Sequence, residues 1–123
     1  MNRRDFFVTA ATVSFAAGNI DAYGGLSLAW SPERLIQFAE RINEEICSKN
    51  GLAFFSGRAP GQPGVYVSHI YRDGKCITNW AFDFNERYWK AGAEETVRAV
   101  FTERFLAYMD DADLLEQIRR SMA

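Results

Sequence analysis

The alternation of apolar and polar positions is clearest over residues 65–84, where two runs rich in β-branched and aromatic residues flank Asp73 and Gly74. Aspartate and glycine tolerate the positive φ angles of a tight two-residue turn, so the stretch predicts a β-hairpin. A register counted outward from this turn places Ile70 opposite Ile77.

Side chains alternate between the two faces of a strand, so this register divides the hairpin into two sets. The more apolar set is predicted to pack on helices and contains Val65, Val67, His69, Tyr71, Cys76, Thr78, Trp80, Phe82 and Phe84. The mixed set is predicted to be solvated or covered by one more element and contains Tyr66, Ser68, Ile70, Arg72, Lys75, Ile77, Asn79, Ala81 and Asp83.

A third strand is predicted over residues 52–56, which a Gly/Pro-rich loop over residues 57–64 connects to the hairpin. Apolar residues recur at helical spacing from Leu35 to Ile46, behind a Ser31 N-cap and ahead of Asn50 and Gly51, which end the helix.

After the hairpin, Asn85 is predicted to cap an interrupted helix that extends to Met109, and Asp110 and Asp111 to cap a last helix. The order predicts an α+β fold, with a three-stranded antiparallel sheet around a central hairpin packed against two to three helices. The sheet becomes four-stranded if residues 6–15 add an edge strand.

The amino-terminal residues Arg3, Arg4 and Phe6 precede an uncharged, weakly apolar stretch and resemble a twin-arginine export signal. Two alternatives remain open for residues 1–22. A cleaved signal implies a periplasmic protein, whereas a retained edge element implies a cytoplasmic one. In either case residues 23–123 are predicted to form a single domain.

Composition narrows the classes of partner. The chain has 123 residues and a formal net charge of −2, which disfavours bulk attraction to nucleic acid or anionic lipid. No run is long and apolar enough to anchor the chain across a bilayer. The chain has two cysteines, Cys47 and Cys76. They either form one disulfide in an oxidising compartment or remain buried thiols.

No catalytic set is recognisable in the sequence. The sole histidine, His69, is expected diagonal to Cys76, with no acidic residue on that face to orient the imidazole. Metal-binding pairs such as C-x-x-C are absent from the sequence, and the loop over residues 57–64 lacks the Lys-Ser/Thr of a phosphate-binding loop. We therefore expect neither an enzyme nor a cofactor.

The favoured hypothesis is a small non-enzymatic protein-binding module of the inhibitor, immunity or adaptor type. Its layout resembles that of phage-borne and mobile-element inhibitors, anti-CRISPR proteins among them. The predicted contact residues lie on the mixed hairpin face and the neighbouring loop and are Arg58, Tyr66, Ile70, Arg72, Lys75 and Ile77. The alternatives are an exported periplasmic protein and a single-stranded nucleic-acid-binding domain that uses Tyr66, Arg72, Lys75 and Asn79.

Overall fold

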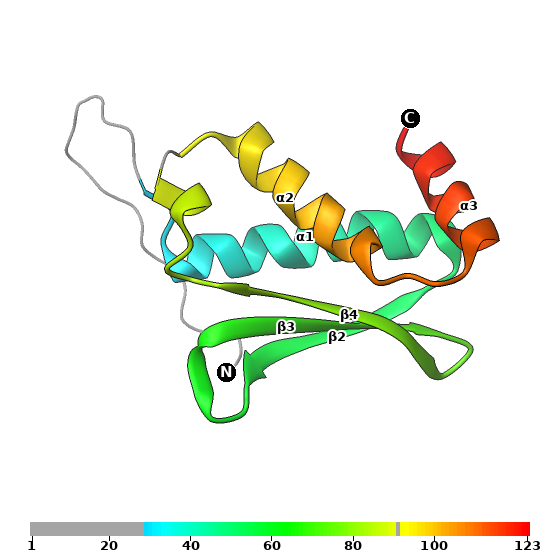
Figure 1. Ribbon diagram of the computed structural model, residues 1–123, viewed down its shortest axis with the longest axis horizontal. Helices are drawn as coiled ribbons and strands as arrows, with labels where there is room; N and C mark the ends of the chain where they lie inside the picture. The colour runs from blue at the N-terminus through cyan, green and yellow to red at the C-terminus, as the bar shows by residue number, and fades with distance from the viewer. Residues whose placement is uncertain (1–28, 91) are drawn as a thin grey trace.

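The computed structural model describes residues 29–90 and 92–123. Its elements are α1 (Pro32–Asn50), β2 (Ala53–Ala59), β3 (Gln62–Arg72), β4 (Lys75–Asp83), the 3₁₀-helix η2 (Arg87–Lys90), α2 (Glu94–Ala107) and α3 (Ala112–Met122). The strands form one antiparallel sheet in the order β2-β3-β4, and the helices lie together on one side of it (Figure 1). The predicted α+β fold is confirmed.

The first helix begins and ends where its sequence indicates. The Ser31 side chain accepts a hydrogen bond from the Arg34 amide at 3.1 Å, which satisfies one of the donors left free at a helix start. At the other end Gly51 adopts a φ of 68° and its amide donates to the Cys47 carbonyl. Both predicted caps are confirmed.

The first two strands are longer than predicted, and the loop expected over residues 57–64 is mostly strand. β2 continues to Ala59, β3 begins at Gln62, and only Pro60 and Gly61 lie between them. Gly61 has a φ of 74°, which suits the tight turn. The glycine and proline content misled the prediction, because pairing with β3 keeps Gly57 extended despite its weak strand propensity.

The register of the hairpin departs from the counted one after a single pair. Tyr71 faces Cys76 as predicted, but Ile70 then faces Thr78, so Ile77 is an extra residue in β4. Such a β-bulge shifts every later pair by one position and exchanges the faces of one strand relative to the other. The predicted pairing of Ile70 with Ile77 is therefore wrong.

The segment after the hairpin is divided more sharply than predicted. Asn85 does not cap a helix; its amide donates to the Asp83 carboxylate at 2.8 Å, and η2 follows at Arg87. Gly92 has a φ of 79°, which separates η2 from α2. The predicted Asp111 cap is confirmed, since its carboxylate accepts from the Asp113 and Leu114 amides.

The core lies between the sheet and the helices. α1 packs over β2 and α2 over β4. Aromatic rings fill the space between them, with Phe101 of α2 within 4.8 Å of Phe82 and 5.1 Å of Trp80, measured between ring centroids. The helices thus cover one face of the sheet and leave its other face, together with the edge of β2, to other contacts.

Candidate functional site: the outward face of the sheet

The corrected register shows which side chains point away from the helices. Ser68 and Trp80 face each other across the hairpin and are both buried, so they point toward the helices. Alternation then directs the neighbouring residues outward. The outward face consists of Ala53, Phe55 and Gly57 of β2, Val65, Val67, His69 and Tyr71 of β3, and Cys76, Asn79, Ala81 and Asp83 of β4.

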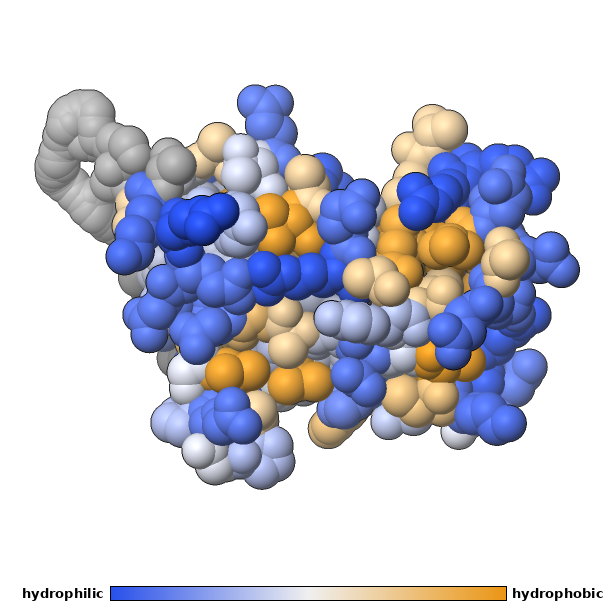
Figure 2. Space-filling view, viewed as in Figure 1, coloured by the Kyte–Doolittle hydropathy of each residue, from blue (hydrophilic) through white to orange (hydrophobic). Residues whose placement is uncertain are grey.

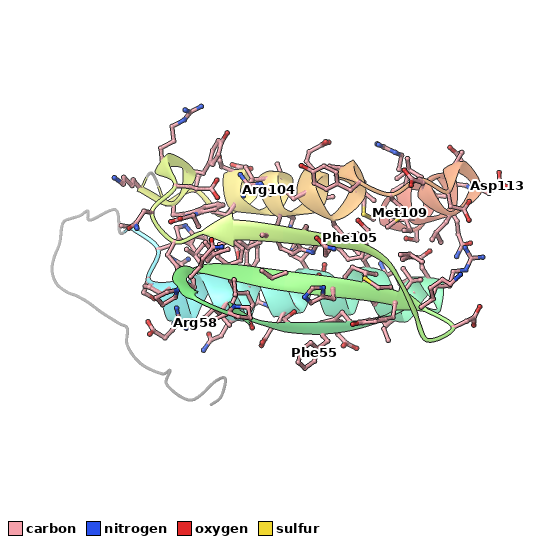
Figure 3. All side chains as sticks on the ribbon, turned by 60° about the horizontal axis from the view of Figure 1, so that its bottom comes forward. Phe55, Arg58, Arg104, Phe105, Met109 and Asp113 are labelled. Carbon is pink, nitrogen blue, oxygen red and sulfur yellow. The ribbon has the colours of Figure 1, made fainter. Side chains whose placement is uncertain are left out.

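Asp83, at the end of β4, is the only charged residue of this outward face, although 24% of the chain is charged. Phe55 is its most prominent residue, because its side chain is 66% exposed and projects away from the helices (Figure 3). His69 lies directly across from Phe55 and Val67 from Gly57. A solvated antiparallel face usually carries polar residues, so a largely apolar face whose one charge lies at its end has the composition of a contact surface.

The predicted contact residues are divided between the two faces. Tyr66 is 2% exposed and Ile70 is fully buried, so their predicted place on an exposed face is wrong. The bulge at Ile77 is the reason, because it turns these two side chains toward the helices while β4 keeps its predicted orientation. Ile77 itself is half-buried and packs against the core.

The basic members of the predicted site are exposed, and two of them, Arg72 and Arg58, form local contacts. Arg72 forms an ion pair with Asp111 at 3.1 Å and thereby joins the hairpin tip to the start of α3. The Asp111 carboxylate has a lowered pKa, mainly because it accepts the Leu114 amide and secondly because of Arg72. Lys75 is exposed at the tip of the hairpin, opposite Arg72.

Arg58 likewise serves the turn beside it. Its guanidinium donates to the Pro63 carbonyl at 2.8 Å and lies 4.8 Å from the centroid of the Phe84 ring. Arg58 therefore stabilises the β2–β3 turn, and its charge is directed to that end of the sheet (Figure 3).

The residues proposed for nucleic-acid binding do not form one surface. Tyr66 is buried on the helix side, whereas Asn79 is exposed on the outward face. Arg72, which was grouped with them, is engaged by Asp111. A stacking platform flanked by basic residues is therefore not assembled on the hairpin.

The two cysteines are free thiols in the structure, and the disulfide considered from the sequence is not formed. Cys47 is a buried residue of α1, and burial raises the pKa of its thiol to about 12. Cys76 is exposed and, as the partner of Tyr71, belongs to the outward face. The sheet lies between these two residues, which explains why they do not meet.

The register counted from the turn, which pairs Ile70 with Ile77, would place His69 opposite Thr78, but the structure gives it another neighbour. It pairs with Asn79 rather than Thr78 and lies opposite Phe55 on its other side. Among the described residues, no group of three or more His, Cys, Asp or Glu side chains is arranged to hold a metal ion. In that same part of the chain, no helix has the length and apolar character needed to cross a membrane.

Sequence reasoning missed a buried polar network beneath α1. Asn43 is fully buried; its amide nitrogen donates to Ser68 Oγ at 2.9 Å and Ser56 Oγ at 3.3 Å. Its amide oxygen accepts from Trp80 Nε1 at 3.1 Å, and the two serine hydroxyls lie 3.0 Å apart. The network ties α1 to all three strands and sets the position of the sheet relative to the helix. The signal in the sequence was a polar residue inside the apolar stripe of α1.

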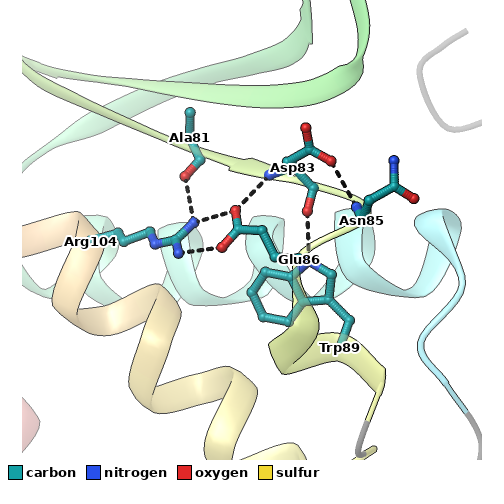
Figure 4. A network of polar contacts seen from close by, with 6 residues as sticks. All are labelled: Ala81, Asp83, Asn85, Glu86, Trp89 and Arg104. Carbon is teal, nitrogen blue, oxygen red and sulfur yellow. Dashed lines mark hydrogen bonds and ion pairs between the residues drawn. The ribbon is translucent and has the colours of Figure 1, made fainter.

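A second network fastens the end of β4 to α2 (Figure 4). Arg104 forms a two-point ion pair with Glu86, one bond of which measures 2.8 Å, and also donates to the Ala81 carbonyl at 3.0 Å. Glu86 accepts the Asp83 amide at 2.8 Å. The hydrogen bond from Arg104 is the main cause that lowers the pKa of the Glu86 carboxyl.

We expect Glu86→Gln to lower the free energy of unfolding by about 1–2 kcal/mol at neutral pH, since the charged pair is lost. The folded-state pKa of Glu86 is depressed, so its contribution is present above the ordinary glutamate pKa and is lost as the pH falls through the folded value. Urea unfolding of both proteins at several pH values between about 7 and 3 should show the difference shrinking in acid. Glu116→Gln, at an exposed pair, is the control, and a difference that stays constant with pH would contradict this explanation.

A hollow lies between the helices α1, α2 and α3. It has a volume of about 280 Å³ and is lined by Ile42, Ile46 and Met122, with the ion pair between Glu45 and Arg98 at its rim. Figure 2 shows hydrophilic residues gathered over α2 and α3, with apolar ones between them. Glu45 and Arg98 neutralise each other, and Lys49, the third charged residue of the lining, donates to the Ser121 carbonyl at 3.5 Å, so we assign this hollow no ligand.

No protein-family model matches the chain, and no curated protein or solved structure matches it. The function is therefore inferred from the geometry of the structure.

Proposed function

We propose that the protein is a non-enzymatic protein-binding module that contacts its partner through the outward face of the sheet. The observation that carries this proposal is the largely apolar outward face around Phe55, which is 66% exposed; the single charge of the face, Asp83, lies at the end of β4. Aromatic residues are enriched and charged residues depleted at the centre of protein interfaces. The contact surface thus lies on the opposite side of the hairpin from Tyr66 and Ile70.

The outward face is suited to a protein rather than to a small molecule or nucleic acid. It is a flat sheet surface, and its central residues Val67, His69 and Tyr71 are half-buried by their neighbours while Phe55 stands above them. A large, rigid aromatic side chain is the kind of residue that contributes most to binding when it enters a pocket on the partner. The inhibitor, immunity and adaptor classes all act by such a contact.

We expect Phe55→Asp to abolish partner capture, because it places a charge at the centre of a desolvated contact. The expected loss of affinity is at least about thirtyfold, as for an interface residue worth 2 kcal/mol. The measurement is affinity capture from cells that naturally express the protein, with wild type and variant compared quantitatively.

Tyr108→Asp is the matched control, since Tyr108 is 72% exposed but lies at the end of α2 rather than on the sheet. A partner retained by wild type and Tyr108→Asp but lost from Phe55→Asp would support the proposal. Equal capture by all three folded proteins, or loss from Tyr108→Asp alone, would refute it.

A further inference from the structure

The outer edge of β2 is the least protected part of the sheet. In the order β2-β3-β4, β2 pairs with β3 alone, and no other strand among the described residues lies beside it. An edge strand presents a row of backbone N–H and C=O groups that can pair with another chain. Proteins usually blunt such edges with charges, prolines, bulges or covering elements.

The hairpin geometry shows which backbone groups point to this edge. Arg72 and Lys75 flank the two-residue turn and therefore form a hydrogen-bonded pair. Counting back from Arg72, every second residue of β3 directs its backbone groups to β4, and the residues between them direct theirs to β2. His69 is three residues before Arg72, so its backbone groups bond to β2. Phe55 lies opposite His69 and so bonds to β3.

The alternate residues of β2 must therefore direct their N–H and C=O groups to the free edge. These residues are Phe54, Ser56 and Arg58. None of them is proline, so each retains a backbone donor. Their side chains point toward the helices, whereas the side chains of Phe55 and Gly57 point outward.

The opposite edge of the sheet is protected. On β4 the Ala81 carbonyl, which points away from β3, accepts the Arg104 guanidinium at 3.0 Å, and the Asp83 amide is bonded to Glu86. The bulge at Ile77 further disrupts the edge near the tip. The β2 edge has a register shift as well, but it lies at the far end of the strand, between Arg58 and Ala59. The segment of β2 before Arg58 is therefore the less protected edge.

The helix above β2 gives its edge a charge. One side of α1 faces α2, where Arg41 and Glu45 form ion pairs at 3.9 and 3.0 Å. The other side overhangs β2, because α2 packs over β4 and Asn43 of α1 bonds to Ser56 of β2.

On that side the helical repeat aligns Glu33, Glu40 and Glu44, which we call the acidic stripe. Tyr66 donates to Glu40 at 2.9 Å. Glu44 is exposed, and within the described part of the chain no basic side chain pairs with it. A strand added beside β2 would therefore lie below an acidic helix side.

We propose that an extended, basic segment of the partner protein pairs with the β2 edge as a fourth strand. This inference rests on the proposed function and names the chemistry of the partner. Residues of the segment opposite Phe54, Ser56 and Arg58 would point to the helix side. Lys or Arg opposite Ser56 would lie near Glu44, because the adjacent Asn43 bonds to Ser56, whereas Arg58 disfavours a like charge opposite it. Residues opposite Phe55 and Gly57 would point outward and extend the apolar face.

The test uses the full chain and a blocked seven-residue peptide that alternates lysine with valine, titrated by NMR or calorimetry. We expect saturable binding below about 1 mM and none for the same peptide with glutamate in place of lysine. Ser56→Pro should bind about tenfold more weakly than Ser56→Ala, because both lose the hydroxyl but only proline removes the edge N–H. Glu44→Lys should weaken binding by a similar factor at low salt.

Equal binding of the peptide by Ser56→Pro and Ser56→Ala, or equal binding of the lysine and glutamate peptides, would overturn the inference. No binding of the lysine peptide to the wild-type chain would overturn it as well. If Phe55→Asp abolishes partner capture while the two Ser56 variants behave alike, the strand pairing alone fails and the protein-binding function stands.

Two other occupants of the edge are distinguishable. A dimer that Ser56→Pro but not Ser56→Ala dissociates in sedimentation would assign the edge to a second copy of the chain. Slow hydrogen exchange at the Phe54, Ser56 and Arg58 amides of the free monomer would assign it to another segment of the same chain. Either result would overturn the proposal, which predicts a monomer with fast exchange at these amides.

Discussion

Replacing Asn43 by alanine is expected to lower the free energy of unfolding by about 3 kcal/mol, one of the largest effects of any single substitution in this fold. The asparagine is fully buried and its amide bonds to Ser56, Ser68 and Trp80. Its removal leaves the Trp80 indole N–H without its acceptor in the core and also opens a cavity. Urea unfolding followed by tryptophan fluorescence measures the loss.

Gln37→Ala is the control on the same helix, because Gln37 is exposed and its replacement should change stability by no more than about 0.5 kcal/mol. A second comparison separates hydrogen bonding from packing. Adding Ser56→Ala and Ser68→Ala to Asn43→Leu should recover part of the stability, since the two buried hydroxyls that lose their bonds to Asn43 are then removed. A triple variant less stable than Asn43→Leu alone, or a loss below about 1 kcal/mol for Asn43→Ala, would contradict this account.

Phe101→Ala is expected to cost about 4 kcal/mol, because the ring is fully buried at the centre of the aromatic core. Its centroid lies 4.8 Å from that of Phe82, 5.1 Å from Trp80 and 5.3 Å from Trp89. No single side chain can move into a space surrounded by large rings, so the cavity stays open. Thermal and urea unfolding should both report the loss.

The matched control is Phe55→Ala, which truncates the same residue type at a 66% exposed position. We expect its stability to change by less than about 0.5 kcal/mol. Comparable losses at Phe55 and Phe101 would contradict the assignment of one ring to a binding surface and the other to the core.

The sequence predicted the features that depend on local chemistry. Ser31 and Gly51 mark the ends of α1, Asp111 caps α3, and Asp73 and Gly74 form the turn with φ angles of 53° and 79°. Each of these residues satisfies a backbone requirement that its neighbours in the chain define. Such requirements do not depend on how the elements pack.

The prediction of which hairpin residues point toward the helices was wrong because it depends on a single residue, Ile77, whose position is determined by packing against the core. Ile77 is inserted as a bulge and lies against the core, and the alternation of β4 by itself does not reveal the insertion. Counting from the turn therefore placed Tyr66 and Ile70 on the wrong face. A one-residue error in a period of two reverses every later side chain.

The outward face was missed for a related reason. Phe54 and Phe55 are adjacent aromatic residues in β2, and alternation requires that one of them point away from the core. The polar partners Ser56 and Ser68 on the helix side made the buried face look like the exposed one. Asn43, a polar residue within the stripe of α1, was the available indication that a polar network lies there.

Residues 1–28 and 91 lie outside the described residues, and so do the twin-arginine resemblance at Arg3, Arg4 and Phe6 and the edge element considered for residues 6–15. Both interpretations of the amino-terminal segment stay predictions. The intact mass of a carboxyl-terminally tagged protein, expressed in a host with twin-arginine export, distinguishes cleavage of about twenty residues from retention.

Binding of a protein by the outward face of the sheet can be detected in the cell by photo-crosslinking. A photoreactive phenylalanine analogue is placed at Phe55 or, as the control, at Tyr108, and cells that naturally express the protein are irradiated. We expect a discrete protein adduct from position 55 and none from position 108. No adduct from position 55, or the same adduct from both positions, would contradict it.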